Sequence, residues 1–100
     1  MRVERHPYGF DTPGRFPNAR RFRGWEGGCA YKAERDGKPF VIIDEGTMAD
    51  FLDESDPTDR EVLNRLVSVI EFENEAEREA YIASRMAFGV NVENDPFFKG

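Results

Sequence analysis

The sequence has very little of the residues that most often build catalytic sites. It holds one cysteine and one histidine among its 100 residues, Cys29 and His6, so a disulfide within the chain is excluded. No phosphate-binding or dinucleotide-binding glycine motif occurs in it. Nucleophilic catalysis needs a nucleophile beside a base, but His6 stands 23 positions before Cys29 with no third group to orient the pair. We expect a structural Cys29, no catalytic residue and no enzyme activity.

Long hydrophobic runs are also missing. The longest are the four-residue runs at 40–43 and 80–83, whereas a helix that crosses a bilayer needs about 20 apolar residues. The sequence opens on charged residues rather than on an apolar leader. These features predict a cytoplasmic, reducing setting and no contact with a membrane.

Charge is divided unevenly along the chain. Residues 1–40 carry nine Lys and Arg against five Asp and Glu, a balance of +4. Residues 41–100 carry five against fifteen, a balance of −10. A basic first part on an acidic body is typical of proteins that dock: either the two parts neutralise each other, or each faces a different partner surface.

Length and composition predict a single small α+β domain, since the chain has 100 residues of which 39% are hydrophobic. Residues 1–28 hold three of the six prolines and five of the nine glycines, and they keep neither a helical nor a strand period. This stretch is therefore expected to be an irregular basic and aromatic N-terminal arm. Residues 29–89 are expected to form the core domain, and residues 90–100 a C-terminal tail.

The expected sheet consists of a β-hairpin and a third strand. Residues 29–45 predict the hairpin, because Asp36-Gly37 is a pair favoured in type I′ turns. Residues 67–72 are rich in β-branched side chains and favour a strand, and Asn74 is well placed to cap a new helix directly afterwards. The alternative is that 67–72 extend the preceding helix, which would turn the fold into a helical bundle carrying one hairpin.

Two to three helices are expected to pack on this sheet. Thr47 is the expected N-cap of a short helix, and a second helix should begin at Asp56-Pro57, because Asp caps well and Pro suits the first helical position. The last helix is expected over 75–87, with Gly89 as its stop signal. The predicted core residues are Phe40, Ile42, Phe51, Leu52, Leu63, Leu66, Ile70, Ile82 and Met86.

Seven carboxylates crowd into residues 44–59, which contain no Lys, Arg or His. Their spacing does not match a calcium-binding EF-hand loop, and we expect neither a metal nor another cofactor. Three interpretations stay open: a solvated helix face, a surface offered to a basic partner, and a metal site. We expect a partner-binding surface made of Asp50, Asp53, Glu54 and Asp56, the first three on one solvent face of the short helix.

Arginine alternates with aromatic residues in the arm, where the candidate binding residues are Arg20, Arg21, Arg23 and Trp25. This combination packs against the protein's own body, lies over another protein, or grips single-stranded nucleic acid. Direct nucleic-acid binding is the least expected, because the −10 body would repel a polyanion. Phe97 and Phe98, near the end of the sequence, either cover the core or anchor a partner.

The function predicted from these features is protein–protein interaction without catalysis. The chain would be a small acidic subunit or adaptor whose partner is a larger protein, or a protein–nucleic acid complex, with a basic surface. The alternative is an inhibitor whose acidic face mimics nucleic acid inside a complex that handles DNA or RNA. In size and charge the chain is similar to anti-defence proteins of phages and mobile elements, anti-CRISPR proteins among them, although no motif carries that analogy.

Overall fold

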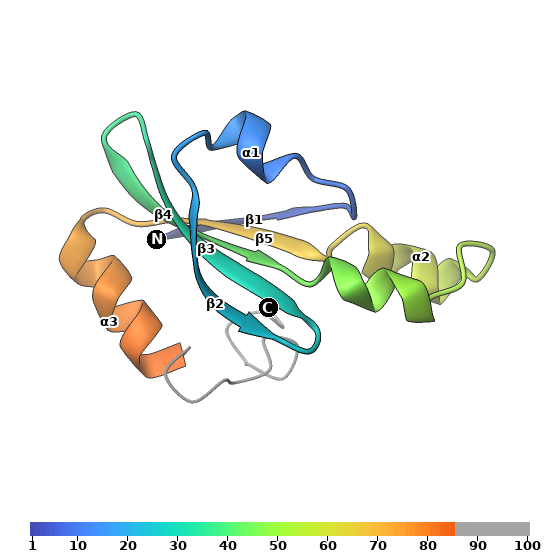
Figure 1. Ribbon diagram of the computed structural model, residues 1–100. Helices are drawn as coiled ribbons and strands as arrows, with labels where there is room; N and C mark the ends of the chain where they lie inside the picture. The colour runs from blue at the N-terminus through green and yellow to red at the C-terminus, as the bar shows by residue number, and fades with distance from the viewer. Residues whose placement is uncertain (86–100) are drawn as a thin grey trace.

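An antiparallel five-stranded sheet forms the centre of the structure, with helices on both of its faces (Figure 1). The computed structural model describes residues 1–85. The strand order is β1-β5-β4-β3-β2, so the first strand of the chain pairs with the last, and the predicted α+β class is confirmed. The elements are β1 (Arg2–His6), α1 (Thr12–Arg15), β2 (Arg20–Trp25), β3 (Gly28–Arg35), β4 (Lys38–Asp44), the 3₁₀ helix η1 (Gly46–Phe51), α2 (Pro57–Leu63), β5 (Val67–Glu71) and α3 (Glu75–Arg85).

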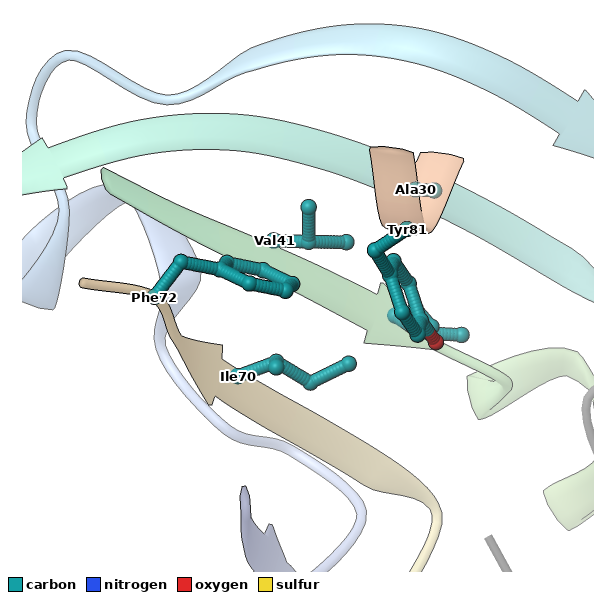
Figure 2. Close-up of a cluster of buried hydrophobic side chains, with 6 residues drawn as sticks. Ala30, Val41, Ile70, Phe72 and Tyr81 are labelled. Carbon is teal, nitrogen blue, oxygen red and sulfur yellow. The ribbon is translucent and has the colours of Figure 1, made fainter. Parts of the chain in front are cut away.

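The core consists of two hydrophobic clusters, one on each face of the sheet. Successive side chains of a strand point to opposite faces, so in the central strand β4 Val41 belongs to the α3 side and Ile42 to the α1 side. Figure 2 shows the α3 side, where the rings of Phe72 and Tyr81 lie 5.3 Å apart between centroids. On the other face Phe16, just after α1, is buried. Burial on both faces explains the continuous apolar run of β4.

The predicted hairpin is confirmed. β3 and β4 pair from Cys29 opposite Asp44 to Arg35 opposite Lys38. The two turn residues have positive φ, 53° at Asp36 and 78° at Gly37, which is the type I′ geometry that matches the twist of the flanking strands. Residues 67–71 are strand β5, so the strand interpretation of this stretch is also confirmed.

The helix starts agree with the capping prediction at two places. The Asp56 side chain accepts from the N–H groups of Thr58 and Asp59 at the start of α2, and Asn74 Oδ1 accepts from Glu77 N at 2.8 Å at the start of α3. α3 is described to Arg85, and positions 86–87 of the predicted helix lie outside the described residues. None of the helices within residues 1–85 has the length and apolarity needed to span a membrane.

The prediction of an irregular arm is wrong, because residues 1–28 contribute both edge strands of the sheet. β1 pairs with β5 over five residues, and β2 pairs with β3. Edge strands commonly carry charged side chains. The arginines of this stretch therefore interrupt the alternation of apolar and polar residues by which a strand is recognised in a sequence. The predicted tail 90–100 lies outside the described residues.

The short helix also differs from its prediction. It is a 3₁₀ helix that begins at Gly46, with Glu45 rather than Thr47 at the N-cap position. Phe51, predicted in the core, is 84% exposed at its end. Leu52, Leu63 and Ile82 are half-buried. Of the other predicted core residues, Met86 lies outside the described residues and these are buried: Phe40, Ile42, Leu66 and Ile70.

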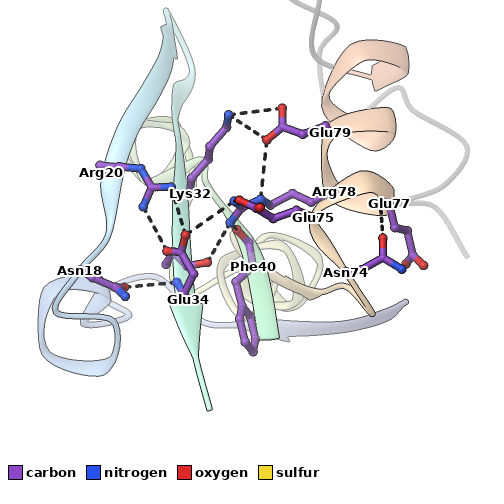
Figure 3. Close-up of polar contacts among 11 residues, drawn as sticks. Asn18, Arg20, Lys32, Glu34, Phe40, Asn74, Glu75, Glu77, Arg78 and Glu79 are labelled. Atoms are coloured by element: carbon purple, nitrogen blue, oxygen red, sulfur yellow. Dashed lines mark hydrogen bonds and ion pairs between the residues drawn. The ribbon is translucent and has the colours of Figure 1, made fainter. Parts of the chain in front are cut away.

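A buried arginine ties α3 to the central hairpin (Figure 3). Arg78 is 1% exposed. Its Nη1 donates to the carbonyl oxygens of Ala33 at 3.0 Å and Phe40 at 3.5 Å. Its Nη2 donates to Glu75 Oε1 at 3.2 Å and lies 3.6 Å from Glu34 Oε1. One side chain thus joins the helix to β3 and β4.

We predict that Arg78→Ala lowers the free energy of unfolding by about 2–5 kcal/mol, because it removes a buried side chain together with its hydrogen bonds. Arg60→Ala, at an exposed position of α2, is the control and should change stability by no more than about 0.5 kcal/mol. Urea unfolding of both variants measures the difference. Equal effects would show that Arg78 does not hold the helix.

Candidate functional site

The connection between β4 and β5 projects beyond the end of the sheet and carries the acidic cluster (Figure 1). We call this segment, residues 45–66, the acidic lobe; it holds seven Asp and Glu against two Arg. Two backbone hydrogen bonds fix its base. Glu45 N donates to Leu66 O at 3.0 Å, and Tyr8 N, in the loop after β1, donates to Leu63 O at 2.8 Å. The lobe is therefore held both by its own two ends and by the N-terminal part of the chain.

The four carboxylates predicted to bind a partner are all exposed and all lie in the acidic lobe. They do not share one helix face, because η1 ends at Phe51 and only Asp50 belongs to it. Asp53 and Glu54 lie in the turn that follows, and Asp56 caps α2. That part of the prediction is wrong: the chain leaves the helix before it reaches Asp53.

The turn after η1 is held by side chains of the lobe itself. Asp53 Oδ1 accepts from Ser55 N at 2.9 Å and from Ser55 Oγ at 2.7 Å. These two bonds stabilise the charged carboxylate and lower the pKa of Asp53. Asp53 N in turn donates to Asp59 Oδ2 at 3.0 Å. Asp53, Asp56 and Asp59 thus shape the lobe, whereas no described contact employs the Asp50 and Glu54 side chains within residues 1–85.

Exposed apolar side chains accompany these carboxylates. Among the described residues, four large hydrophobic side chains are exposed, and three of them lie on or beside the acidic lobe. Phe51 is 84% exposed, Tyr8 58% and Val62 36%. Phe51 stands directly after Asp50 and two positions before Asp53. An exposed aromatic ring surrounded by charge is the composition of an anchor residue in a binding surface.

A hollow of about 410 Å³ lies between the loop after β1 and α2. Its walls are both apolar and charged, because Tyr8 and Leu63 line it together with Glu54 and Arg60. Sequence reasoning missed Phe51 as a surface residue and missed this hollow entirely. The hollow depends on the loop after β1 returning to α2, a contact between distant parts of the sequence.

The arginines predicted to help in binding lie on β2, and they are partly engaged within the protein. Arg20 forms two hydrogen bonds with Glu34, at 3.0 and 3.1 Å, which lower the pKa of Glu34. Arg21 is exposed, Arg23 is half-buried, and Trp25 packs on the α3-side cluster. Only the Trp25 end of β2 approaches the acidic lobe, through a hydrogen bond from Thr47 Oγ1 to Glu26 O at 3.4 Å.

The two groups of predicted binding residues are therefore not one surface. Arg20 lies five residues along β2 from Trp25, about 17 Å at the rise of a strand. The predicted tail anchors Phe97 and Phe98 lie outside the described residues. The carboxylates and Trp25 are brought to the same end of the molecule, and Arg20 is not.

The remaining candidates for chemistry are separated by the sheet. Cys29, Asp44, Val67 and His6 are register partners in one row across β3, β4, β5 and β1. Cys29 and His6 are thus three strand spacings apart, about 14 Å, too far for one to activate the other. Within residues 1–85 no group of three or more His, Cys, Asp and Glu side chains converges in a way that could hold a metal ion.

Cys29 has a local partner instead. Its Sγ lies 3.1 Å from Tyr31 Oη on the same face of β3. The hydrogen bond with Cys29, together with partial burial, raises the pKa of Tyr31 to about 12. Burial adds to this shift because it disfavours the charged phenolate.

We predict that Cys29→Ala lowers the pKa of Tyr31 from about 12 toward its ordinary value of 10.0. A raised pKa favours the neutral phenol of the folded state, so this contribution to stability is present below pH 10.0 and is lost as pH rises toward about 12. An alkaline titration of tyrosinate absorbance measures the shift. Tyr31→Phe identifies the transition, and an unchanged late transition in Cys29→Ala would contradict the assignment.

Comparison with known proteins adds no family to these observations. No protein-family model matches the chain, nor does any curated protein or any solved structure. The function therefore has to be argued from the residues of the acidic lobe.

Proposed function

We propose that this protein is a non-enzymatic binding module that docks on a larger partner through the acidic lobe. The observation that carries the proposal is Phe51, a large aromatic side chain 84% exposed among carboxylates. Burying such a ring on association supplies apolar contact, and the surrounding charge selects the partner. The chain would act as a small subunit or adaptor of an assembly.

The chemistry of the lobe defines the partner surface. It should be basic, to match the carboxylates, and it should contain an apolar pocket for the Phe51 ring. The hollow lined by Tyr8 and Leu63 offers a second apolar contact beside Glu54. A partner that has such a pocket, and beside it a segment in which Lys or Arg alternates with apolar residues, matches the carboxylates, the Phe51 ring and the hollow.

Nucleic-acid mimicry is the alternative, since the lobe is acidic and exposed. A mimic needs free carboxylates in a row at intervals like those of phosphates. Two of the four predicted carboxylates, Asp53 and Asp56, accept hydrogen bonds from their own turn and helix. The exposed anchors Phe51 and Tyr8 favour the adaptor hypothesis, because mimicry does not require them.

The first test is to identify the partner and then to remove the anchor. Affinity capture from the native host, with mass spectrometry, gives the partner, and titration calorimetry then compares wild type with Phe51→Ala. Aromatic anchors contribute about 2 kcal/mol or more, so the affinity should fall at least about 30-fold. The exposed ring contributes little to folding, and the midpoint of unfolding should stay nearly unchanged.

Phe51→Trp is the matched control, because it keeps a large aromatic ring at the same exposed position and should bind within a few-fold of wild type. If Phe51→Ala binds as tightly as wild type, the lobe does not dock through this ring. If the captured partner handles DNA or RNA and an oligonucleotide displaces the protein regardless of residue 51, the mimic hypothesis replaces the adaptor.

The second test addresses charge. Asp50→Lys with Glu54→Lys should slow association with the basic partner, because long-range attraction speeds encounter. The difference from wild type should shrink as salt rises, since charges are screened over about 8–10 Å at physiological ionic strength. These two positions are chosen because neither carboxylate shapes the lobe. Stopped-flow rates at two salt concentrations measure the effect.

A control with the same change in net charge places the new lysines elsewhere. Ala76→Lys, Ala80→Lys, Ala83→Lys and Ser84→Lys alter exposed positions of α3, and should slow association less than the change in the lobe. Equal slowing by both variants would mean that net charge, rather than the acidic lobe, governs encounter.

A further inference from the structure

The two edges of the sheet differ in how they are protected. β2 is interrupted by a bulge, because its register with β3 shifts between Arg21 and Arg23. β1 pairs with β5 in five consecutive register pairs without a shift, and it contains no proline. A bulge twists an edge away from a new strand, whereas a regular edge can accept one. β1 is therefore the edge better suited to pairing.

The register of the sheet shows which backbone groups of β1 point outward. Phe72 N donates to Pro39 O at 2.9 Å, and Glu45 N donates to Leu66 O at 3.0 Å. Along an antiparallel strand, every second residue turns its N–H and C=O toward the same neighbouring strand. Residues 66 and 72 of this segment face β4, and so do the even-numbered residues between them. Val69 therefore turns its N–H and C=O toward β1, where its register partner is Glu4. Val3, next to Glu4, consequently turns its own N–H and C=O away from the sheet. Within residues 1–85 no strand pairs with β1 on that side.

Symmetry limits how a second copy could pair here. If a two-fold axis perpendicular to the sheet relates the two copies, the sheet continues from one copy into the other and each face stays continuous. One residue of β1 then lies opposite the same residue of the second copy, and the axis is named by that residue. An axis at Glu4 or at Arg5 would place like charges opposite each other. An axis at Val3 places Arg2 opposite Glu4 of the second copy, twice by symmetry, and joins the two Val3 residues in a hydrogen-bonded pair. Within each chain Arg2 Nη2 already donates to Glu4 Oε1 at 2.6 Å. The two side chains are still 70% and 42% exposed, so both can also reach a second chain and extend this pair across the axis.

We propose that two copies of this chain associate edge to edge through β1, with the two-fold axis at Val3. The Val3 side chain already packs on the α3-side cluster, so pairing brings the two cores side by side. β1 runs toward the acidic lobe, because His6 at its end pairs with Val67, where the lobe rejoins the sheet. The dimer therefore carries its two lobes at opposite ends. The interface is short, so the dimer should be weak and depend on concentration.

Charge exchange between the two positions tests the register. Arg2→Glu and Glu4→Arg, each alone, place like charges opposite each other across the axis, and should weaken dimerisation about tenfold. The double variant Arg2→Glu/Glu4→Arg restores opposite charges and should return the dissociation constant to within a few-fold of wild type. Sedimentation equilibrium on the full chain measures all four proteins, with circular dichroism as the check that each is folded.

A second measurement follows the backbone directly. Amide exchange of Val3 should slow as protein concentration rises, whereas that of Glu4, which faces β5, should not depend on concentration. Asp50→Lys with Glu54→Lys should dimerise like wild type, which separates this proposal from the function of the lobe. A chain that stays monomeric at hundreds of micromolar, or a dimer that the single reversals do not weaken, overturns the proposal.

Discussion

The buried guanidinium of Arg78 is the interaction on which the arrangement of the sheet and its last helix depends. A charged group is expensive to bury unless its donors are satisfied, and here backbone carbonyls of β3 and β4 and the carboxylates of Glu34 and Glu75 surround it. These partners come from three elements, so the helix is fixed in position rather than merely attracted to an apolar surface. Because α3 is anchored in this way, Tyr81, one turn after Arg78, packs on the α3-side cluster.

Local signals predicted the elements that depend on neighbouring residues. The Asp36-Gly37 turn, the Asp56 cap and the Asn74 cap each act over a few positions, and each was confirmed. The edge strands β1 and β2 were missed because their pairing is non-local: Arg2 meets Glu71, 69 positions later. Arginines, prolines and glycines are frequent in this part of the sequence, and apolar and polar residues do not alternate there. The segments become regular strands only by hydrogen bonding to β5 and β3.

The candidate site was predicted in composition but not in shape. The carboxylates were found because charge is visible in a sequence. The sequence predicted Phe51 in the core because a full α-helix after Thr47 would pack along its length against the sheet. A 3₁₀ helix that ends at Phe51, beyond the end of the sheet, offers that ring nothing to pack against. Exposure of Phe51 is therefore a consequence of where the chain turns.

The division of charge follows from the topology of the chain. All basic residues of the first part except Arg15, which ends α1, lie on strands. Several are paired: Arg20 with Glu34, Lys32 with Glu79 and Lys38 with Glu73. Seven of the other carboxylates gather in residues 45–66, the connection between β4 and β5, where strand packing does not constrain the chain. Since neither Asp50 nor Glu54 has a described structural task, the fold does not require their charge. Such charge on a projecting segment, beside an exposed aromatic ring, is more readily explained by binding than by stability.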